Sequence, residues 1–158
     1  MTHAEAIDKV CRFFRTAQWA CFPEVSLNLY DPQKWVCIGQ LPIPDVIAIK
    51  RNFKRKSIAI FEVKVSRADF LQEVRKKEFL KSVPFADKFY YACPDGLIKP
   101  EEVPQGCGLY YIMDGYCVCV KCARAQKVEL TVDTLWSIIL SYETKYITKK
   151  LKEALDNE

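Results

Sequence analysis

The chain has 158 residues, half of them apolar, and a net charge of +4 from 24 basic and 20 acidic residues. This length predicts one domain, 1–158, with a single core, and the composition excludes disordered, collagen-like and low-complexity chains. No apolar run reaches the roughly 18 residues of a membrane span, and the N-terminus is charged where a signal peptide is apolar. We therefore expect a cytoplasmic protein that makes no contact with membranes.

The first half of the chain predicts a helix and three strands. Apolar residues recur at intervals of three and four over residues 3–18, which indicates an amphipathic helix capped by Thr2. A strand is expected at 24–30. Two runs rich in β-branched residues follow, at 43–50 and 57–65, with a basic loop between them. Because both runs are almost continuously apolar, they predict a hairpin with arms buried on both faces.

A second helix and a further strand follow the hairpin. Ser66 and Asp69 have the spacing of a capping box, so a helix is expected over 67–81, and Pro84 ends it. The apolar segment 87–94 predicts the next strand.

The last third of the chain predicts a hairpin and a long helix. Asp114 and Gly115 lie between two apolar runs within 108–122, which is typical of a tight β-turn. Apolar residues at helical spacing from Leu135 to Leu155 indicate a C-terminal helix. The order of elements predicts an α/β fold, a mixed β-sheet flanked by helices.

Three charged residues interrupt the central hairpin. Side chains alternate along a strand, so Glu62 and Lys64 share one face. If the basic loop turns around Phe53 and Lys54, residues whose numbers sum to 107 face each other, which sets Asp45 opposite Glu62 with Cβ atoms about 5 Å apart. Two buried carboxylates repel each other, and a divalent cation would compensate their charge. In the purely structural alternative, Lys64 pairs with Glu62 and Asp45 caps a turn.

Such a site could perform phosphoryl chemistry. Mg²⁺ prefers one or two carboxylates together with water and phosphate oxygens. Lys64 would lie beside the cation, where it could position or deprotonate an attacking water and counter the charge of the transition state.

The same residues carry a family resemblance. Pro44-Asp45 and Glu62-Val63-Lys64, separated by 16 residues, resemble the PD-(D/E)XK motif of the restriction-endonuclease-like nuclease superfamily. The segments SRADFLQEVRKKEFL, ADKFYYACPDG and VPQGCGLYYIMDGY resemble the MmcB-like DNA repair proteins of that superfamily. The resemblance covers residues 40–125 and implies a restriction-endonuclease-like fold, an αβββαβ core with an added C-terminal hairpin and helix.

The resemblance implies a role for each motif residue. Asp45 and Glu62 would be ligands of Mg²⁺ or Mn²⁺, the backbone carbonyl of Val63 a further ligand, and Lys64 the catalytic lysine. The implied activity is metal-dependent hydrolysis of DNA phosphodiester bonds, in DNA repair.

Other acidic and polar positions have two interpretations. Relatives often take a further acidic ligand from the first helix or strand, which Glu5 or Glu24 could supply, with Glu24 slightly favoured at the start of a predicted strand. Asp69, Glu73 and Arg75 match polar positions of the helix that follows the motif, and they also fit a helix cap and a solvated helix surface.

Two basic clusters are candidates for contact with DNA phosphates, although such clusters are also common in solvated loops. One is the loop 50–56 and the other lies on the expected helix 67–81. The expected DNA-binding residues are Lys50, Arg51, Lys54, Arg55, Lys56, Arg67, Arg75, Lys76 and Lys77. Lys76 departs from the aromatic residue that relatives often have there, which implies a different groove contact.

Four cysteines near the C-terminal hairpin, Cys107, Cys117, Cys119 and Cys122, raise the question of zinc or an iron-sulfur cluster, which some RecB-like relatives carry. Their spacing lacks the paired C-x-x-C of common zinc sites, and Cys117 and Cys119 share a strand face that excludes Cys122. The sequence therefore favours small buried thiols. The single histidine, His3, disfavours catalytic triads of the Ser/His/Asp or Cys/His kind.

Two other functions fit the same residues. A nuclease-like fold could bind DNA without turnover, or serve as an assembly factor. Hydrolysis of RNA or of transfer-RNA ends is a third possibility, because nothing in the sequence identifies a contact to the 2′-hydroxyl. The sequence also permits a homodimer without predicting its surface.

Overall fold

The computed structural model describes residues 1–31, 36–40, 43–128 and 131–156. Three short 3₁₀ helices at Glu78–Lys81, Val83–Phe85 and Pro100–Glu102 supplement the main elements. The main elements are α1 (His3–Thr16), β1 (Trp19–Pro23), β2 (Asn28–Asp31), β3 (Val36–Gln40), β4 (Val46–Lys50), β5 (Ile58–Val63), α2 (Arg67–Lys76), β6 (Lys88–Pro94), β7 (Gly108–Ile112), β8 (Cys117–Lys121) and α3 (Val132–Leu155).

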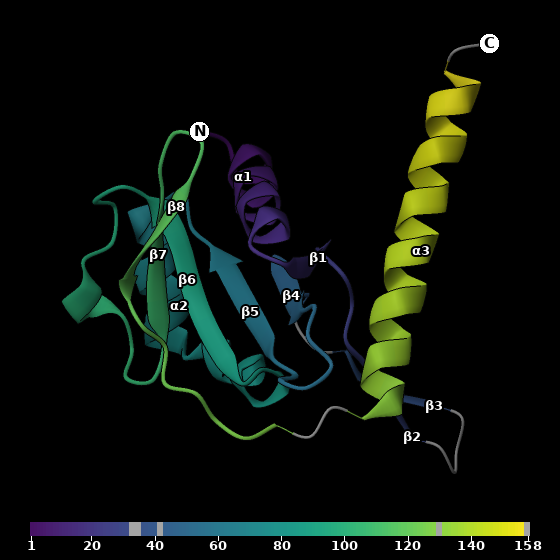
Figure 1. The fold of residues 1–158 in the computed structure, drawn as a ribbon, viewed down its shortest axis with the longest axis horizontal. Helices are drawn as coiled ribbons and strands as arrows, with labels where there is room; N and C mark the ends of the chain where they lie inside the picture. Colours follow the sequence, from purple (N-terminus) through teal and green to yellow (C-terminus); the bar gives the residue numbers. More distant parts are fainter. Residues whose placement is uncertain (32–35, 41–42, 129–130, 157–158) are drawn as a thin grey trace.

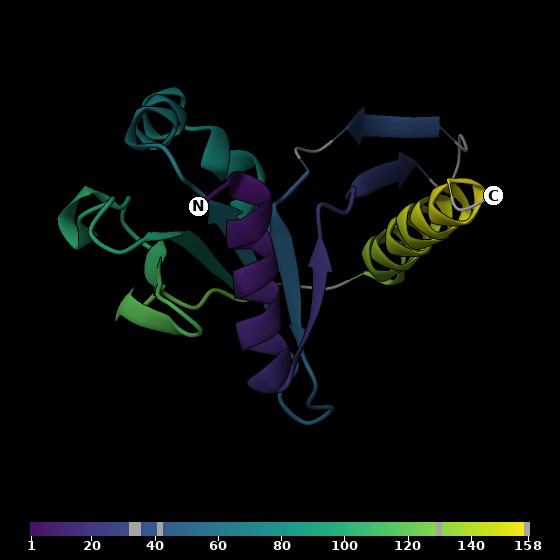
Figure 2. The ribbon, with the colours of Figure 1, turned by 90° about the horizontal axis from the view of Figure 1, so that it is seen from above.

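A mixed six-stranded sheet carries the fold, in the order β1-β4-β5-β6-β7-β8, and β2 pairs with β3 in a separate ribbon. The pairs β1/β4, β4/β5 and β7/β8 are antiparallel, whereas β5/β6 and β6/β7 are parallel. Helices α1 and α2 lie on opposite faces of this sheet, and α3 stands beyond the β1 edge, next to β2 and β3 (Figures 1 and 2). The molecule is thus an α/β protein with helices on both faces of its sheet. Among the described helices, none is both long and apolar enough to cross a bilayer.

The face under α1 is packed with aromatic rings. Phe14 of α1 contacts Phe61 of β5 with ring centroids 4.5 Å apart, and Phe61 stacks on Tyr90 of β6 at 5.3 Å. Val10 and Val63 are also buried on this side. Burial of such side chains contributes about 1.5–3 kcal/mol each, so this contact fixes α1 on the sheet.

The opposite face is covered by α2 and by part of α3. Phe70 of α2 lies edge-on to Tyr91 of β6, with centroids 5.1 Å apart. Ile47, Ile60 and Ile138 complete the same buried cluster. The central strands β4 and β5 are therefore buried on both faces, as their continuous apolar runs predict.

The register of the central hairpin is confirmed. Val46 pairs with Phe61 and Ile49 with Ile58, so opposite residues sum to 107. The strand 87–94, the hairpin around Gly115 and the C-terminal helix are also confirmed, as β6, β7/β8 and α3.

Two expected elements are wrong in their limits. The strand expected at 24–30 is replaced by β1 and β2, because Glu24 has a φ of 48°, in the left-handed region, and cannot continue an extended strand. The helix expected over 67–81 ends at Lys76. There, Lys77 adopts a left-handed conformation with a φ of 56°, and 3₁₀ turns carry the chain onward. Ser66 does cap α2, accepting a hydrogen bond from the backbone N–H of Asp69.

Gly108, at the start of β7, marks a close approach that we expect to control stability. A Cβ atom there would lie 2.4 Å from the Tyr90 ring and 2.6 Å from the backbone nitrogen of Ala123. Gly108→Ala should therefore lower the free energy of unfolding by about 2–3 kcal/mol, measured by urea denaturation. The control is Gly115→Ala, where nothing lies within 4 Å and only the positive φ is strained, at a cost of about 1 kcal/mol. Equal losses in the two variants would contradict this interpretation.

Candidate functional site

The charged residues of the central hairpin converge at one end of the sheet. Extending the β4/β5 register by one pair places Asp45 opposite Glu62, on the face covered by α2. The side chains of Asp45, Glu62 and Lys64 are each only 14–15% exposed. The pairing expected from the sequence is therefore present, and its charges are largely removed from water.

Asp45 is fixed by the backbone of β5. Its Oδ2 accepts a hydrogen bond of 2.7 Å from the N–H of Val63. The Nε2 of His3, at the start of α1, lies 3.3 Å from the same oxygen and 3.2 Å from the carbonyl oxygen of Val63. As the single histidine of the chain, His3 counted in the sequence only as evidence against histidine-based catalysis, and the docking of α1 on the sheet brings it to Asp45.

Glu62 is the least compensated charge of the site. Burial, followed by the negative charges of Asp45 and Glu73, raises its pKa to about 9, and the ammonium of Lys64 offsets this only in part. The carboxyl group therefore holds a proton at neutral pH and can share it with Asp45. A bound cation would take the place of that proton.

Lys64 is held by a second carboxylate. Its Nζ forms an ion pair with Glu73 of α2 and lies 3.7 Å from Glu62. Burial opposes the charged amine, but the hydrogen bond to Glu73 and the charges of Glu73, Glu62 and Asp45 outweigh it and raise the pKa of Lys64. The residue is thus an ammonium at neutral pH, suited to binding negative charge. The alternative role from the sequence, removal of a proton from water, would require it to lose its own proton first.

Glu73 belongs to the site and not to a solvated helix surface. It is 9% exposed, and one of its carboxylate oxygens accepts a hydrogen bond of 2.9 Å from the hydroxyl of Tyr91. Burial and the charge of Glu73 raise the pKa of Tyr91, so the hydroxyl remains a donor. The helical spacing from Phe70 to Glu73 could have placed Glu73 on the buried side of α2.

The donor set suits a hard cation. Within the described ranges, no group of three or more His, Cys, Asp or Glu side chains is arranged to hold a metal ion. Two carboxylates, of Asp45 and Glu62, and the carbonyl of Val63 remain, and Mg²⁺ typically binds to few protein oxygens and keeps several waters. The residues therefore fit the cation that the sequence implies.

The two candidates for an additional acidic ligand have other partners. Glu5 accepts a hydrogen bond from the backbone of Thr2 and completes the capping box of α1. Glu24 forms an ion pair with Lys145 of α3. The structure thus assigns neither carboxylate to the Asp45 and Glu62 pair.

The basic residues lie in two places. The loop 51–57 joins the far ends of β4 and β5, about 15 Å from Asp45 at the usual strand rise. Arg67 is engaged by Glu102 through two guanidinium nitrogens, so it is less available to DNA than the sequence suggests. Arg75, Lys76 and Lys77 are exposed at the C-terminal end of α2.

The four clustered cysteines are divided between environments. Cys107 is buried on the α2 face of the sheet and Cys117 on the α1 face. The thiols of Cys119 and Cys122 are exposed and lie 3.9 Å apart. The expected opposite orientation of these two is wrong, because the β7/β8 register shifts next to Tyr110. Burial of all four thiols was also expected, and holds only for Cys107 and Cys117.

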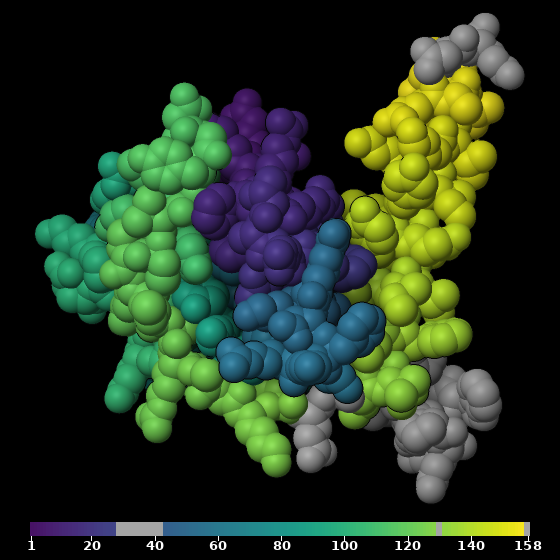
Figure 3. All heavy atoms as spheres, in the orientation of Figure 1, coloured from purple at the N-terminus to yellow at the C-terminus, as the bar shows by residue number. Residues whose placement is uncertain are grey.

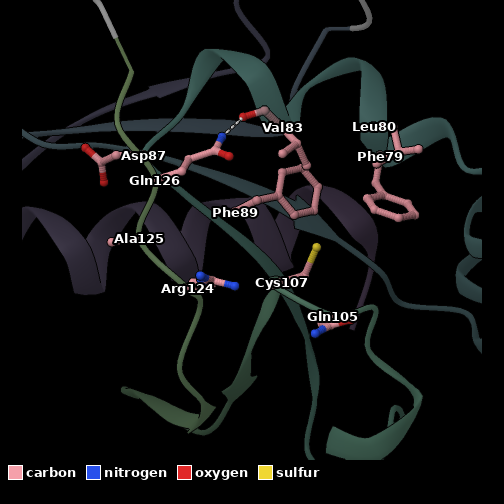
Figure 4. Close-up of a pocket in the computed structure, with 11 residues that line it drawn as sticks. Phe79, Leu80, Val83, Asp87, Phe89, Gln105, Cys107, Arg124, Ala125 and Gln126 are labelled. Carbon is pink, nitrogen blue, oxygen red and sulfur yellow. Dashed lines mark hydrogen bonds between the residues drawn. The ribbon is translucent and has the colours of Figure 1, made fainter.

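A cavity of about 470 Å³ lies elsewhere, at the start of β6 and β7. In Figure 4, the Cys107 thiol points toward the rings of Phe79 and Phe89, and the Gln126 amide donates to the carbonyl of Val83. None of the described residues that line this cavity belongs to the Asp45 and Glu62 site.

Comparison with known proteins yields a fold without a function. No model of a protein family matches the sequence, and no curated protein matches it. A solved structure of a protein of unknown function from Silicibacter pomeroyi is similar, with a TM-score of 0.64 and 19% identity. The match covers 99% of this chain and 94% of that chain. This similarity supports the α/β architecture and carries no information about activity.

The raised pKa of Glu62 predicts a pH-dependent stability. Its ordinary value is 4.5 and its folded value about 9. Between these values the folded state retains a proton that the unfolded state has lost, so stability falls as pH rises. Glu62→Gln should remove this slope and raise the free energy of unfolding at pH 8 by about 1–3 kcal/mol. Urea denaturation at pH 5 and pH 8 measures both effects, and equal slopes in parent and variant would contradict the assignment.

Proposed function

We propose that this chain is a Mg²⁺- or Mn²⁺-dependent phosphodiesterase that cleaves DNA, in the context of DNA repair. The observation that carries the proposal is the convergence of the carboxyl groups of Asp45 and Glu62 next to the ammonium group of Lys64. Phosphoryl transfer needs positioning and charge stabilisation more than covalent chemistry, and this site supplies both.

The topology also supports the restriction-endonuclease-like fold implied by the motif. Helix α1 precedes the antiparallel strands β1, β4 and β5, and α2 connects β5 to the parallel strand β6. This order corresponds to the αβββαβ core, with β2 and β3 inserted and β7, β8 and α3 added. In support of this reading, the motif residues lie where β4 begins and β5 ends, so they meet at one end of the sheet.

Each residue has a distinct task in this proposal. Asp45, Glu62 and the Val63 carbonyl would hold the cation, which when bound would neutralise the scissile phosphate and favour hydroxide formation from water. Lys64 binds a phosphate oxygen or orients the attacking water through its ammonium group. Glu73 acts as a positioning residue, because it fixes the Lys64 amine and is itself fixed by Tyr91.

The DNA would extend beyond the site. The basic loop lies about 15 Å from Asp45, so it would contact phosphates several nucleotides from the cleaved bond. The exposed residues at the end of α2, Arg75, Lys76 and Lys77, offer a second set of contacts. Both would weaken with added salt, since phosphate binding releases counterions.

Cleavage should depend on the charge of Asp45. Asp45→Asn keeps an acceptor for the Val63 N–H but removes a charged ligand, so cleavage of DNA with Mn²⁺ should fall at least about 100-fold. The matched control is Asp95→Asn, an exposed residue just after β6. Product formation on nicked, branched and single-stranded DNA is the measurement. Equal cleavage by parent and Asp45→Asn would reject the assignment.

The pH dependence of cleavage should depend on the contact between Glu73 and Lys64. Glu73→Gln removes the carboxylate that holds the ammonium and raises its pKa, so Lys64 should lose its proton at lower pH. The alkaline limb of the pH–rate profile should move to lower pH, with kcat reduced about 10-fold or more. Glu73→Asp should recover part of the rate. A reduced rate with an unchanged pH profile would leave Glu73 with a structural role alone.

A DNA-binding module without turnover is the second candidate, and one observation favours it. The Lys64 amine is engaged by Glu73, and the Val63 carbonyl lies against His3, so protein groups occupy the positions that phosphate and cation would use. In that case the protein would bind the three DNA substrates without yielding products in Mn²⁺. RNA in the same panel tests the third function that the sequence permits.

A further inference from the structure

Helix α3 has two apolar sides, and among the described residues only one of these sides packs against other elements. On the packed side, Ile138 is 1% exposed and the ring of Tyr142 lies 5.3 Å from that of Phe22. The hydroxyl of Ser141 accepts a hydrogen bond from the backbone of Ser26. These contacts, with the Lys145 ion pair to Glu24, belong to the first 14 residues of the helix.

The other side of α3 carries an outward stripe of large apolar residues. They follow intervals of four and seven, so they share one side of the helix, opposite Ile138 and Tyr142. The outward stripe consists of Val132, Trp136, Leu140, Ile147, Leu151 and Leu155, which are between 44% and 75% exposed. Ile139 and Tyr146, 56% and 55% exposed, flank the stripe and do not share its spacing. The second half of the helix stands clear of the body of the molecule (Figures 1 and 3). A helix that is apolar on both sides calls for burial on both sides.

The spacing of the outward stripe is the same read from either end. The intervals are four, four, seven, four and four, with their centre between Glu143 and Thr144. Two antiparallel copies centred there would set Val132 against Leu155, Trp136 against Leu151 and Leu140 against Ile147. A two-fold axis requires this self-complementarity, because each copy presents the same surface. An unrelated partner would impose no such symmetry.

The charges of α3 are divided between its two halves in a way that also favours antiparallel pairing. Residues 132–143 contain two acidic and no basic residues, whereas 144–155 contain four lysines and one glutamate. Lys145 is already paired with Glu24, which leaves Lys149, Lys150 and Lys152 for a partner. An antiparallel pair brings the acidic half of one helix beside these lysines of the other, and a parallel pair would bring like charges together.

We infer that α3 is a homodimerisation helix. It pairs with α3 of a second copy in the antiparallel direction, along the outward stripe, about a two-fold axis between Glu143 and Thr144. The pairing joins two candidate sites in one particle and rests on none of the residues of the proposed nuclease site. It gives a surface to the homodimer that the sequence permits.

Sedimentation of the full chain tests the pairing. The parent should sediment as a dimer, and Leu140→Asp or Ile147→Asp, which place a charge on the outward stripe, should give monomers with an unchanged circular dichroism spectrum. The control is Phe53→Asp, an exposed apolar residue of the basic loop that is 98% exposed, and it should remain dimeric. A monomeric parent would overturn the inference, whether or not it uses these residues to bind lipid vesicles. Variants Leu140→Asp and Ile147→Asp that both remain dimeric would also overturn it.

Cross-linking tests the direction. With the exposed Cys119 and Cys122 changed to serine, Glu143→Cys should form an intermolecular disulfide under mild oxidation, because it lies beside the axis. Val132→Cys should not, because its counterpart in the second copy lies at the other end of the helix. Equal cross-linking of both would indicate parallel helices and refute the arrangement.

Discussion

The balance of buried charge around Glu62 is the constraint that the site and its surroundings share. Three carboxyl groups and the ammonium group of Lys64 occupy a largely buried end of the sheet, and this ammonium group lies closer to Glu73 than to Glu62. Glu62 then lowers its energy by keeping a proton. Such an arrangement is poor as a stabilising device, because apolar residues of similar size would be less costly. The presence of these charges at a largely buried end of the sheet is what motivates the functional proposal.

The burial of β5 restricts these charges to the end of the strand. Both faces of that strand are covered, by aromatic rings under α1 and by Phe70 and Tyr91 on the other side. Charges are therefore confined to the end of the strand, where Glu62 still has partners. Helix α2 brings one of them, since the turn that packs Phe70 on the sheet also delivers Glu73 to Lys64. The packing of α2 on the sheet therefore also determines the charge distribution of the site.

Local and periodic features were predictable from the sequence, and long-range docking was not. A turn centred on Phe53 and Lys54 predicted the hairpin register and hence the meeting of Asp45 with Glu62. The left-handed Glu24 is held by its N–H bond to the Asp45 carbonyl, a contact across 21 residues that no local pattern reports. His3 reaches the site only because α1 crosses the sheet, and the approach of Cys119 to Cys122 depends on a shift in β-pairing.

The backbone of Val63 is held between Asp45 and His3, and this has a practical consequence. Its N–H is bound by Asp45 and its carbonyl by His3, so the start of α1 forms one wall of the carboxylate site. An affinity tag fused directly ahead of Thr2 would therefore sit against that wall, and a polyhistidine tag would offer extra imidazoles within reach of the two acids. Metal content and activity measured on protein tagged in this way would partly describe the tag. Removal of the tag before any metal titration follows directly from the position of α1.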